Sequence, residues 1–447
     1  MKLWFDNTWE KLRDSFWFLP TVMVAGAVVL SLVMIQLDKA NPHQNWVTSL
    51  GWTFSRGPEG SRAVLSTVAA SMMTIASVTF SITIVALQLA SSQFGPRLLR
   101  NFMRDRGNQV AIGTFIATFT YCLLVLRTVN GTESEQFVPH MSVTVGLLLA
   151  LASVGVLIYF IHHSAESIQA ENVIATVSNE LRGAIDKLYP QQLGNNPSDD
   201  ASELQLPATF EQDSVPIRSP RSDYLQAIDV NKLLKLAVDN NCLFSVDVRP
   251  GKFCFEGDLL VRAWPPDQIN DKVTKEVCDG FYFGSRRTLS QDVEFAIDQL
   301  VEIAVRALSP GINDPNTAIN CVDRLGAALC TLSNRDFPSR FRHDDAGHLR
   351  VVTDVSTIAG IVDAAFDQIR QASRENASVT IRLLETLRAV AGHVCNEDFR
   401  GALRRQAEAV HRGSQDGIKE QSDRNVVEQR YQDVITVLSE EQHNSKE

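Results

Sequence analysis

The sequence AVLSTVAASMMTIASVTFSITIVALQLASSQFGP, residues 63–96, decides the fold of the first third of the chain. Its 34 residues contain no Asp, Glu, Lys, Arg or His. A helix of that length reaches about 51 Å at 1.5 Å per residue, whereas the hydrocarbon layer of a membrane is about 30 Å thick. The stretch therefore predicts a transmembrane helix that must tilt, break or extend into water.

Three further runs without Asp, Glu, Lys or Arg cover Ser15–Leu37, Gly107–Leu126 and Gln136–Ala165, and none of similar length follows residue 165. Because an ionised side chain in mid-bilayer costs several kcal/mol, such runs indicate membrane-spanning helices. The first run lacks a small-residue cleavage site and is predicted to be an anchor, not a signal peptide. The expected fold is an α-helical membrane protein with four transmembrane helices, followed by a cytoplasmic α+β domain.

The distribution of charge predicts the orientation. The loop after residue 96 holds Arg97, Arg100, Arg104 and Arg106, whereas residues 128–140 hold no Lys or Arg. Since positive charge stays on the cytoplasmic side, both termini are expected in the cytoplasm. The four arginines either fix this topology through lipid phosphates or form an anion-attracting pore mouth.

The long uncharged run has a polar face. At 100° per residue, six polar side chains fall within an arc of about 100°. We call these residues the polar seam: Thr67, Ser71, Thr74, Ser81, Gln88 and Ser92. Small hydroxyl residues commonly let helices pack and hydrogen-bond in lipid. They also line water-filled pores at oligomer axes, which is the alternative interpretation.

The remainder of the chain is acidic. Residues 1–162 hold 11 Lys/Arg and 8 Asp/Glu, so an overall charge of −10 leaves −13 for the other 285 residues. This charge disfavours nucleic acid as a partner. Composition predicts a helical extension and polar linker over 163–222, and a small β-rich module over 223–289. A helical domain over 290–412 and a polar tail over 413–447 with one short amphipathic helix follow.

A helix hairpin is predicted inside the helical domain. Ser290 is a suitable N-cap for a helix that ends at Leu308, and Asp314-Pro315 suits the start of the next one. The corner between them, Ser309–Thr317, is rich in Pro, Gly, Asn and Asp. It is either a rigid turn held by side-chain caps or a pocket for an ion or small ligand.

The sequence contains none of the familiar catalytic motifs considered below. The chain has no phosphate-binding glycine loop of the G-x-x-x-x-G-K-[ST] type, no G-x-S-x-G and no H-E-x-x-H. His343, Asp344, Asp345 and His348 contain metal-ligating groups, but a loop-like context does not fix them on one face. We therefore expect no enzyme, no cofactor and no metal.

Two stretches carry a resemblance. TFSITIVALQLASSQFGPRLLRNF, residues 79–102, and RRTLSQDVEFAIDQLVEIAVRALSPGINDPNTAINCVDRL, residues 286–325, resemble the bacterial membrane-protein family called domain of unknown function 2254. The resemblance implies a bacterial inner-membrane location and assigns no activity. Its polar signature residues are Arg287, Thr288, Gln291, Asp292, Ser309, Asn313 and Asp314.

Two functional hypotheses follow. The first is a homo-oligomeric ion channel or conductance regulator, with the second transmembrane helix lining the pore and a cytoplasmic gating domain. The alternative is a non-conducting sensor or scaffold whose cytoplasmic domain binds a partner or small ligand. Membrane lipids and further copies of the chain are the expected partners.

Overall fold

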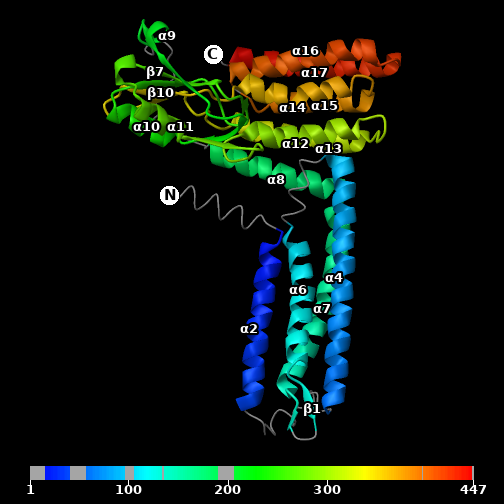
Figure 1. The fold of residues 1–447 in the computed structure, drawn as a ribbon. Helices are drawn as coiled ribbons and strands as arrows, with labels where there is room; N and C mark the ends of the chain where they lie inside the picture. The colour runs from blue at the N-terminus through cyan, green and yellow to red at the C-terminus, as the bar shows by residue number, and fades with distance from the viewer. Residues whose placement is uncertain are drawn as a thin grey trace. The chain divides into compact units, whose positions relative to one another are not determined.

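The computed structural model describes residues 16–40, 57–95, 105–132, 135–189, 206–394 and 396–444. Most of these residues are helical, and the chain divides into two compact units, residues 1–173 and 174–447 (Figure 1). Each unit has its own core, so each is described separately.

The first unit consists of four long helices, each apolar and long enough to cross a membrane. They are α2 (Phe18–Ala40), α4 (Pro58–Phe94), α6 (Arg106–Leu126) and α7 (His140–Ser167). A small hairpin of β1 (Asn130–Thr132) and β2 (Glu135–Phe137) lies between α6 and α7. The four predicted uncharged runs thus all form helices.

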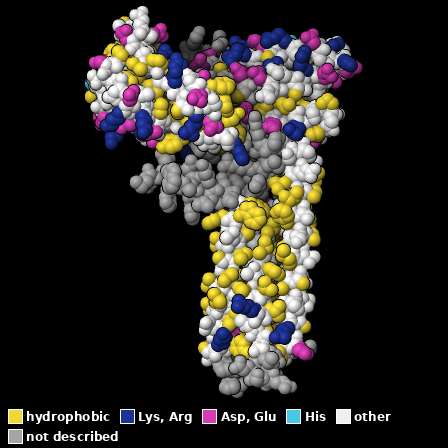
Figure 2. All heavy atoms as spheres, viewed as in Figure 1, with side chains coloured by type: hydrophobic (Ala, Val, Ile, Leu, Met, Phe, Trp, Pro, Cys, Tyr) yellow, Lys and Arg dark blue, Asp and Glu magenta, His cyan; other side chains and the backbone are white. Residues whose placement is uncertain are grey.

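Helix α6 is at the centre of this unit, because α2, α4 and α7 all pack against it. Its buried face includes Phe115, Tyr121 and Val125. The other helices present mainly hydrophobic side chains on the visible surface, and charged side chains are sparse there (Figure 2). An apolar exterior around an apolar core is the pattern expected of a helix bundle surrounded by lipid.

The second unit contains two sheets with strand orders β3-β7-β5-β10-β9 and β6-β4-β8. The strands of the larger sheet are β3 (Val215–Arg218), β5 (Leu243–Val246), β7 (Leu259–Trp264), β9 (Phe341–His343) and β10 (Leu349–Val352), and those of the smaller are β4 (Asp223–Ile228), β6 (Phe253–Cys254) and β8 (Phe281–Gly284). The β region thus begins before residue 223. It also takes β9 and β10 from within 290–412, because β10 pairs parallel with β5.

Helices complete the second unit. They are α8 (Ala170–Leu188), α9 (Phe210–Asp213), α10 (Val230–Asp239), the short 3-10 helix η2 (Pro266–Gln268), α11 (Asp271–Cys278), α12 (Val293–Ala307), α13 (Pro315–Ser333), α14 (Ile358–Ala372), α15 (Ala377–Ala391), α16 (Glu397–Gly417) and α17 (Gln421–Asn444). The predicted hairpin is present, since α12 packs against α13. Helices α10 and α11 share the apolar core of the sheets.

Three local predictions were wrong. The helical extension predicted after the fourth apolar helix is a separate helix, because Ile168 and Gln169 separate α7 from α8. The N-cap of α12 is Asp292, whose carboxylate accepts the Phe295 N–H, and not Ser290. The polar tail predicted from residue 413 overlaps α16, which continues to Gly417 before α17 begins.

Helix α17 is also longer than the short amphipathic helix expected for the tail. It has 24 residues and packs on α15 and α16 through Val427, Val434 and Leu438, which are fully buried. Its polar composition obscured this role in the sequence, because the apolar stripe is only one residue wide per turn.

Candidate functional site

The polar seam lies on the outer face of α4. All six seam residues are exposed, while the opposite face of the same helix packs against its neighbours. That buried face is formed by Leu65, Ala69, Met72, Ala76, Thr79, Thr83, Ala86 and Ala90. The seam therefore does not join α4 to the other described helices of its own unit.

Most seam hydroxyls donate to the backbone of their own helix. Thr67, Thr74 and Ser81 each donate to the carbonyl oxygen four residues earlier, at 2.7, 3.0 and 3.0 Å. Such bonds satisfy the hydroxyl proton inside an apolar environment while an oxygen lone pair still faces outward. Together with the exposed Val78 and Val85, the seam positions recur at alternating intervals of four and three residues. This is the spacing with which helices pack around a common axis.

Of the four arginines after α4, only Arg106 is described. It begins α6 and is exposed, whereas Arg97, Arg100 and Arg104 lie outside the described residues. Beside it, the Asp105 carboxylate caps α6 and lies 2.7 Å from Nε2 of His163 on α7. Gly107 allows this approach, because a Cβ atom there would lie 2.5 Å from the imidazole.

Three signature residues, Arg287, Gln291 and Asp292, lie with Asp298 where the β strands meet α12. Arg287 contacts Asp292 at 2.8 Å through Nε and Asp298 at 2.5 Å through Nη1. Asp292 is 5% exposed. Burial raises the pKa of its carboxyl group, and the hydrogen bond from Arg287 opposes that shift. We call Arg287, Asp292, Asp298 and Gln291 the polar clamp.

The rest of the clamp joins α12 to the smaller sheet. The side-chain amide of Gln291 pairs with the backbone of Ile228, accepting from its N–H at 3.0 Å and donating to its carbonyl at 3.1 Å. Thr288 contributes differently: its hydroxyl oxygen is enclosed and has no hydrogen-bond partner among the described residues. The clamp residues therefore fix one structural element against another.

Gly251 lies close to the Asp292 carboxylate of the clamp. It adopts φ +92°, and a Cβ atom at this position would lie 2.1 Å from Oδ2 of Asp292. This close approach of the Asp292 carboxylate was not predicted from the sequence. Next to it, Arg249 contacts Glu294 at 3.0 Å, and Glu294 also accepts from Ser356. Sequence reasoning missed this second pair.

The Ser309–Thr317 corner is held by its own polar groups. Asp314 accepts from the N–H groups of Asn316 and Thr317 and from the Thr317 hydroxyl. The hydroxyl bond holds the pKa of Asp314 below its usual value. Ser309 donates to the Arg306 carbonyl at 2.6 Å, and Asn313 adopts the left-handed φ of +50°. These bonds correspond to the rigid turn, which was the first of the two interpretations.

The His343–His348 segment is the β9–β10 hairpin. Asp344 accepts from the N–H groups of Ala346 and His348 and from Arg350 Nε, and the Arg350 bond lowers its pKa to about 2. Among the described residues, no group of three His, Cys, Asp or Glu side chains is close enough to hold a metal ion. Asp344 therefore acts as a turn residue.

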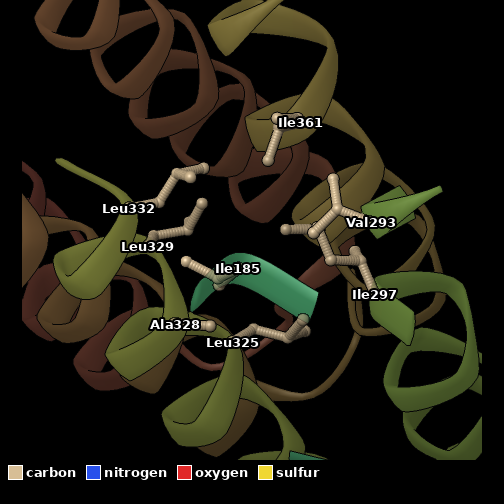
Figure 3. Close-up of a pocket in the computed structure, with 9 residues that line it drawn as sticks. Ile185, Val293, Ile297, Leu325, Ala328, Leu329, Leu332 and Ile361 are labelled. Carbon is tan, nitrogen blue, oxygen red and sulfur yellow. The ribbon is translucent and has the colours of Figure 1, made fainter. Parts of the chain in front are cut away.

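A cavity among the helices of the second unit is lined only by apolar side chains (Figure 3). Ile185 of α8, Val293 of α12, Leu329 of α13 and Ile361 of α14 converge on it. Its volume of about 10 Å³ is near the lower limit for one water molecule. We interpret it as a packing gap.

Comparison with known proteins agrees with the resemblance noted from the sequence. A family model described as "Predicted membrane protein (DUF2254)" matches residues 13–389. Uncharacterized proteins of Mycobacterium bovis and of two Mycobacterium tuberculosis strains are 34% identical over 432 residues, which cover 94% of this chain and 80% of each relative. No solved structure matches the chain.

Proposed function

We propose that this chain, which belongs to the DUF2254 family of predicted membrane proteins, forms a homo-oligomeric ion channel or conductance regulator whose pore is lined by α4. In this proposal the four apolar helices cross a bacterial inner membrane, and both termini are cytoplasmic. The second unit acts as the gating domain and has no catalytic role.

The observation that carries the proposal is the outward position of the polar seam. The opposite face of α4 is occupied by the helix's own bundle, so the six exposed polar side chains meet either lipid or another copy. In an oligomer, their heptad-like spacing lets equivalent helices surround one axis. Hydroxyl oxygens with free lone pairs at that axis can replace part of an ion's hydration shell.

Ion flux into proteoliposomes tests the proposal. Ser71→Leu, Thr74→Leu and Ser81→Leu should each abolish flux, because a large apolar side chain removes a polar group and narrows the pore. Ser66→Leu is the matched control. Ser66 is an exposed hydroxyl residue on the same helix that also donates to its own backbone, but it lies outside the seam. This control variant should conduct normally.

Native mass spectrometry in lipid nanodiscs is the companion measurement, because a pore lined by one helix per copy needs a closed ring. A monomer in every lipid, or wild-type vesicles that stay impermeable under all ion gradients, would contradict the channel. The non-conducting sensor or scaffold would then be the better proposal. Reporter fusions at each terminus test the cytoplasmic orientation.

A further inference from the structure

The hairpin between β5 and β7 carries an exposed aromatic cluster on the surface of the second unit. Phe253 and Phe255 pack edge to face at 5.2 Å between ring centroids, and Tyr224 packs on Phe253 at 5.0 Å. Phe255 is 63% exposed, which is the highest value for a large hydrophobic side chain among the described residues of this unit. We call Tyr224, Phe253 and Phe255 the aromatic patch.

The backbone holds the patch outward. Tyr224 of β4 and Phe253 of β6 are direct partners in the sheet, so their side chains lie on one face, and Phe255 follows two residues later. The neighbouring Leu225 and Cys254 are buried on the opposite face. The Phe255 N–H donates to Asp258, which fixes the turn beyond the patch. The rings are thus presented by an ordered hairpin and not by a loose loop.

The strand that carries these rings is also unprotected. Among the described strands, β6 pairs only with β4, so it is an edge strand of the smaller sheet. Natural proteins rarely leave aromatic side chains on an open edge, because such edges promote aggregation. The patch is therefore expected to be covered when the protein is in its normal environment.

The charged residues around the patch favour an anionic surface as the partner that covers it. The surrounding segments 218–224, 249–258 and 284–287 together hold six Lys/Arg and three Asp/Glu, in a unit that is otherwise acidic. Arg249 and Arg287 are paired with carboxylates of α12. Lys252, Arg221 and Arg286 are exposed, as are Glu256 and Asp258. Apolar rings beside exposed cations match the layered chemistry of a membrane surface, where acyl chains lie beneath phosphate groups.

The length of the connection supports the same partner. The second unit begins at Ile174, seven residues after α7 ends at Ser167. In a protein whose α7 crosses the membrane, this short connection confines the whole unit to the neighbourhood of the bilayer. We propose that the aromatic patch docks on the anionic lipid surface, with Phe253 and Phe255 entering the interface and Lys252 contacting phosphate. This inference rests on the membrane location proposed above and not on conduction.

Site-directed spin labelling of the full-length protein in nanodiscs tests the proposal. A nitroxide on Phe255→Cys should be about threefold less accessible to a water-soluble nickel reagent than one on Val238→Cys, and more accessible to oxygen. Val238 is the matched control, because it is 43% exposed and lies on α10 of the same module. The unsubstituted protein gives the background from its native cysteines.

The lipid composition of the nanodiscs tests whether an anionic surface protects the label from the nickel reagent. Protection at Phe255→Cys should be strong with phosphatidylglycerol and weaker with phosphatidylcholine alone, and Lys252→Glu should reduce it. Equal accessibility at positions 255 and 238 in correctly inserted protein would overturn the inference. So would dipolar broadening between labels at position 255, which would identify a second copy as the cover. Failure to enter nanodiscs would instead refute the proposed membrane location.

Discussion

The polar seam of α4 and the polar clamp of the second unit use similar residue types in opposite ways. Seam side chains are exposed, and Thr74 and Ser81 donate to carbonyl groups of their own helix. Within the clamp, Asp292 is buried, Arg287 and Asp298 are half-buried, and Gln291 is exposed but bonded to the Ile228 backbone. Replacing a seam residue leaves no distant group without a partner. Replacing a clamp residue leaves its partners without a hydrogen bond, because these partners cannot bond to water instead. The clamp is therefore a structural feature, and the seam is available for function.

The largest expected effect comes from breaking the buried ion pair. Arg287→Ala leaves Asp292 ionised and buried, which should lower the free energy of unfolding by about 3–5 kcal/mol. Arg382→Ala is the control, because Arg382 and its partner Asp323 are 43% and 37% exposed. That variant should lose only about 0.5 kcal/mol.

Alkylation of the buried Cys254 during urea unfolding, resolved by mass spectrometry, measures both variants. Equal losses in the free energy of unfolding would mean that the buried Arg287 pair contributes no more to stability than the exposed Arg382 pair.

The next effect tests the close approach at Gly251. Gly251→Ala must accommodate both φ +92° and a Cβ atom 2.1 Å from Asp292, while Gly257→Ala has φ +90° and no neighbour within 4 Å. The left-handed backbone alone costs about 1–2 kcal/mol. We expect Gly251→Ala to exceed Gly257→Ala by about 1–3 kcal/mol, as for other overpacked sites. The same cysteine assay measures both variants. Identical urea midpoints would show that Asp292 moves aside without loss of stability.

The helix that carries the polar seam was predicted well from the sequence, whereas the clamp was predicted poorly, and the reason is physical. Uncharged runs and a 100° angular period are local properties, so residues 63–96 alone indicate the helix and its polar face. The clamp depends on contacts between Gly251, Ile228 and α12, which are far apart in the chain. The sequence marked Asp292 and Gln291 only through a family resemblance. The pairing of β10 with β5 is likewise not local, so β10 was not predicted to join the β-rich module.

A smaller effect compares the two faces of α4. Ala90, which is 1% exposed, lies on the buried face, so Ala90→Leu should overpack the bundle and cost about 1–3 kcal/mol. Ser81→Leu on the exposed seam should change stability by less than about 0.5 kcal/mol. Thermal exposure of Cys122, a fully buried residue of α6, reports both changes. A large loss of stability in Ser81→Leu would show that the seam packs against something in the isolated protein.

The smallest effect compares two carboxylates that pair with arginine. Burial raises the pKa of Asp292, so its folded form binds a proton more readily than its unfolded form, and its contribution to stability falls as pH rises through that pKa. For Asp344, the Arg350 bond lowers the pKa to about 2. Its stabilising contribution is therefore complete above the unfolded value of about 4 and is lost as pH falls through about 2.

Asp344→Asn isolates the second carboxylate, because it keeps the side-chain shape but removes the charge that Arg350 contacts. The difference in urea midpoint between this variant and the wild type should be constant above about pH 5 and shrink toward pH 2. The opposite trend, a difference that grows in acid, would mean that the hairpin carboxylate titrates like Asp292. The Asp344 and Arg350 side chains are only 9% and 15% exposed, so both pairs are shielded from water, but the donors around Asp344 lower its pKa while burial raises the pKa of Asp292. The balance between hydrogen-bond donors and desolvation around each carboxylate, and not the presence of an ion pair, would then explain the opposite pH dependence of the two sites.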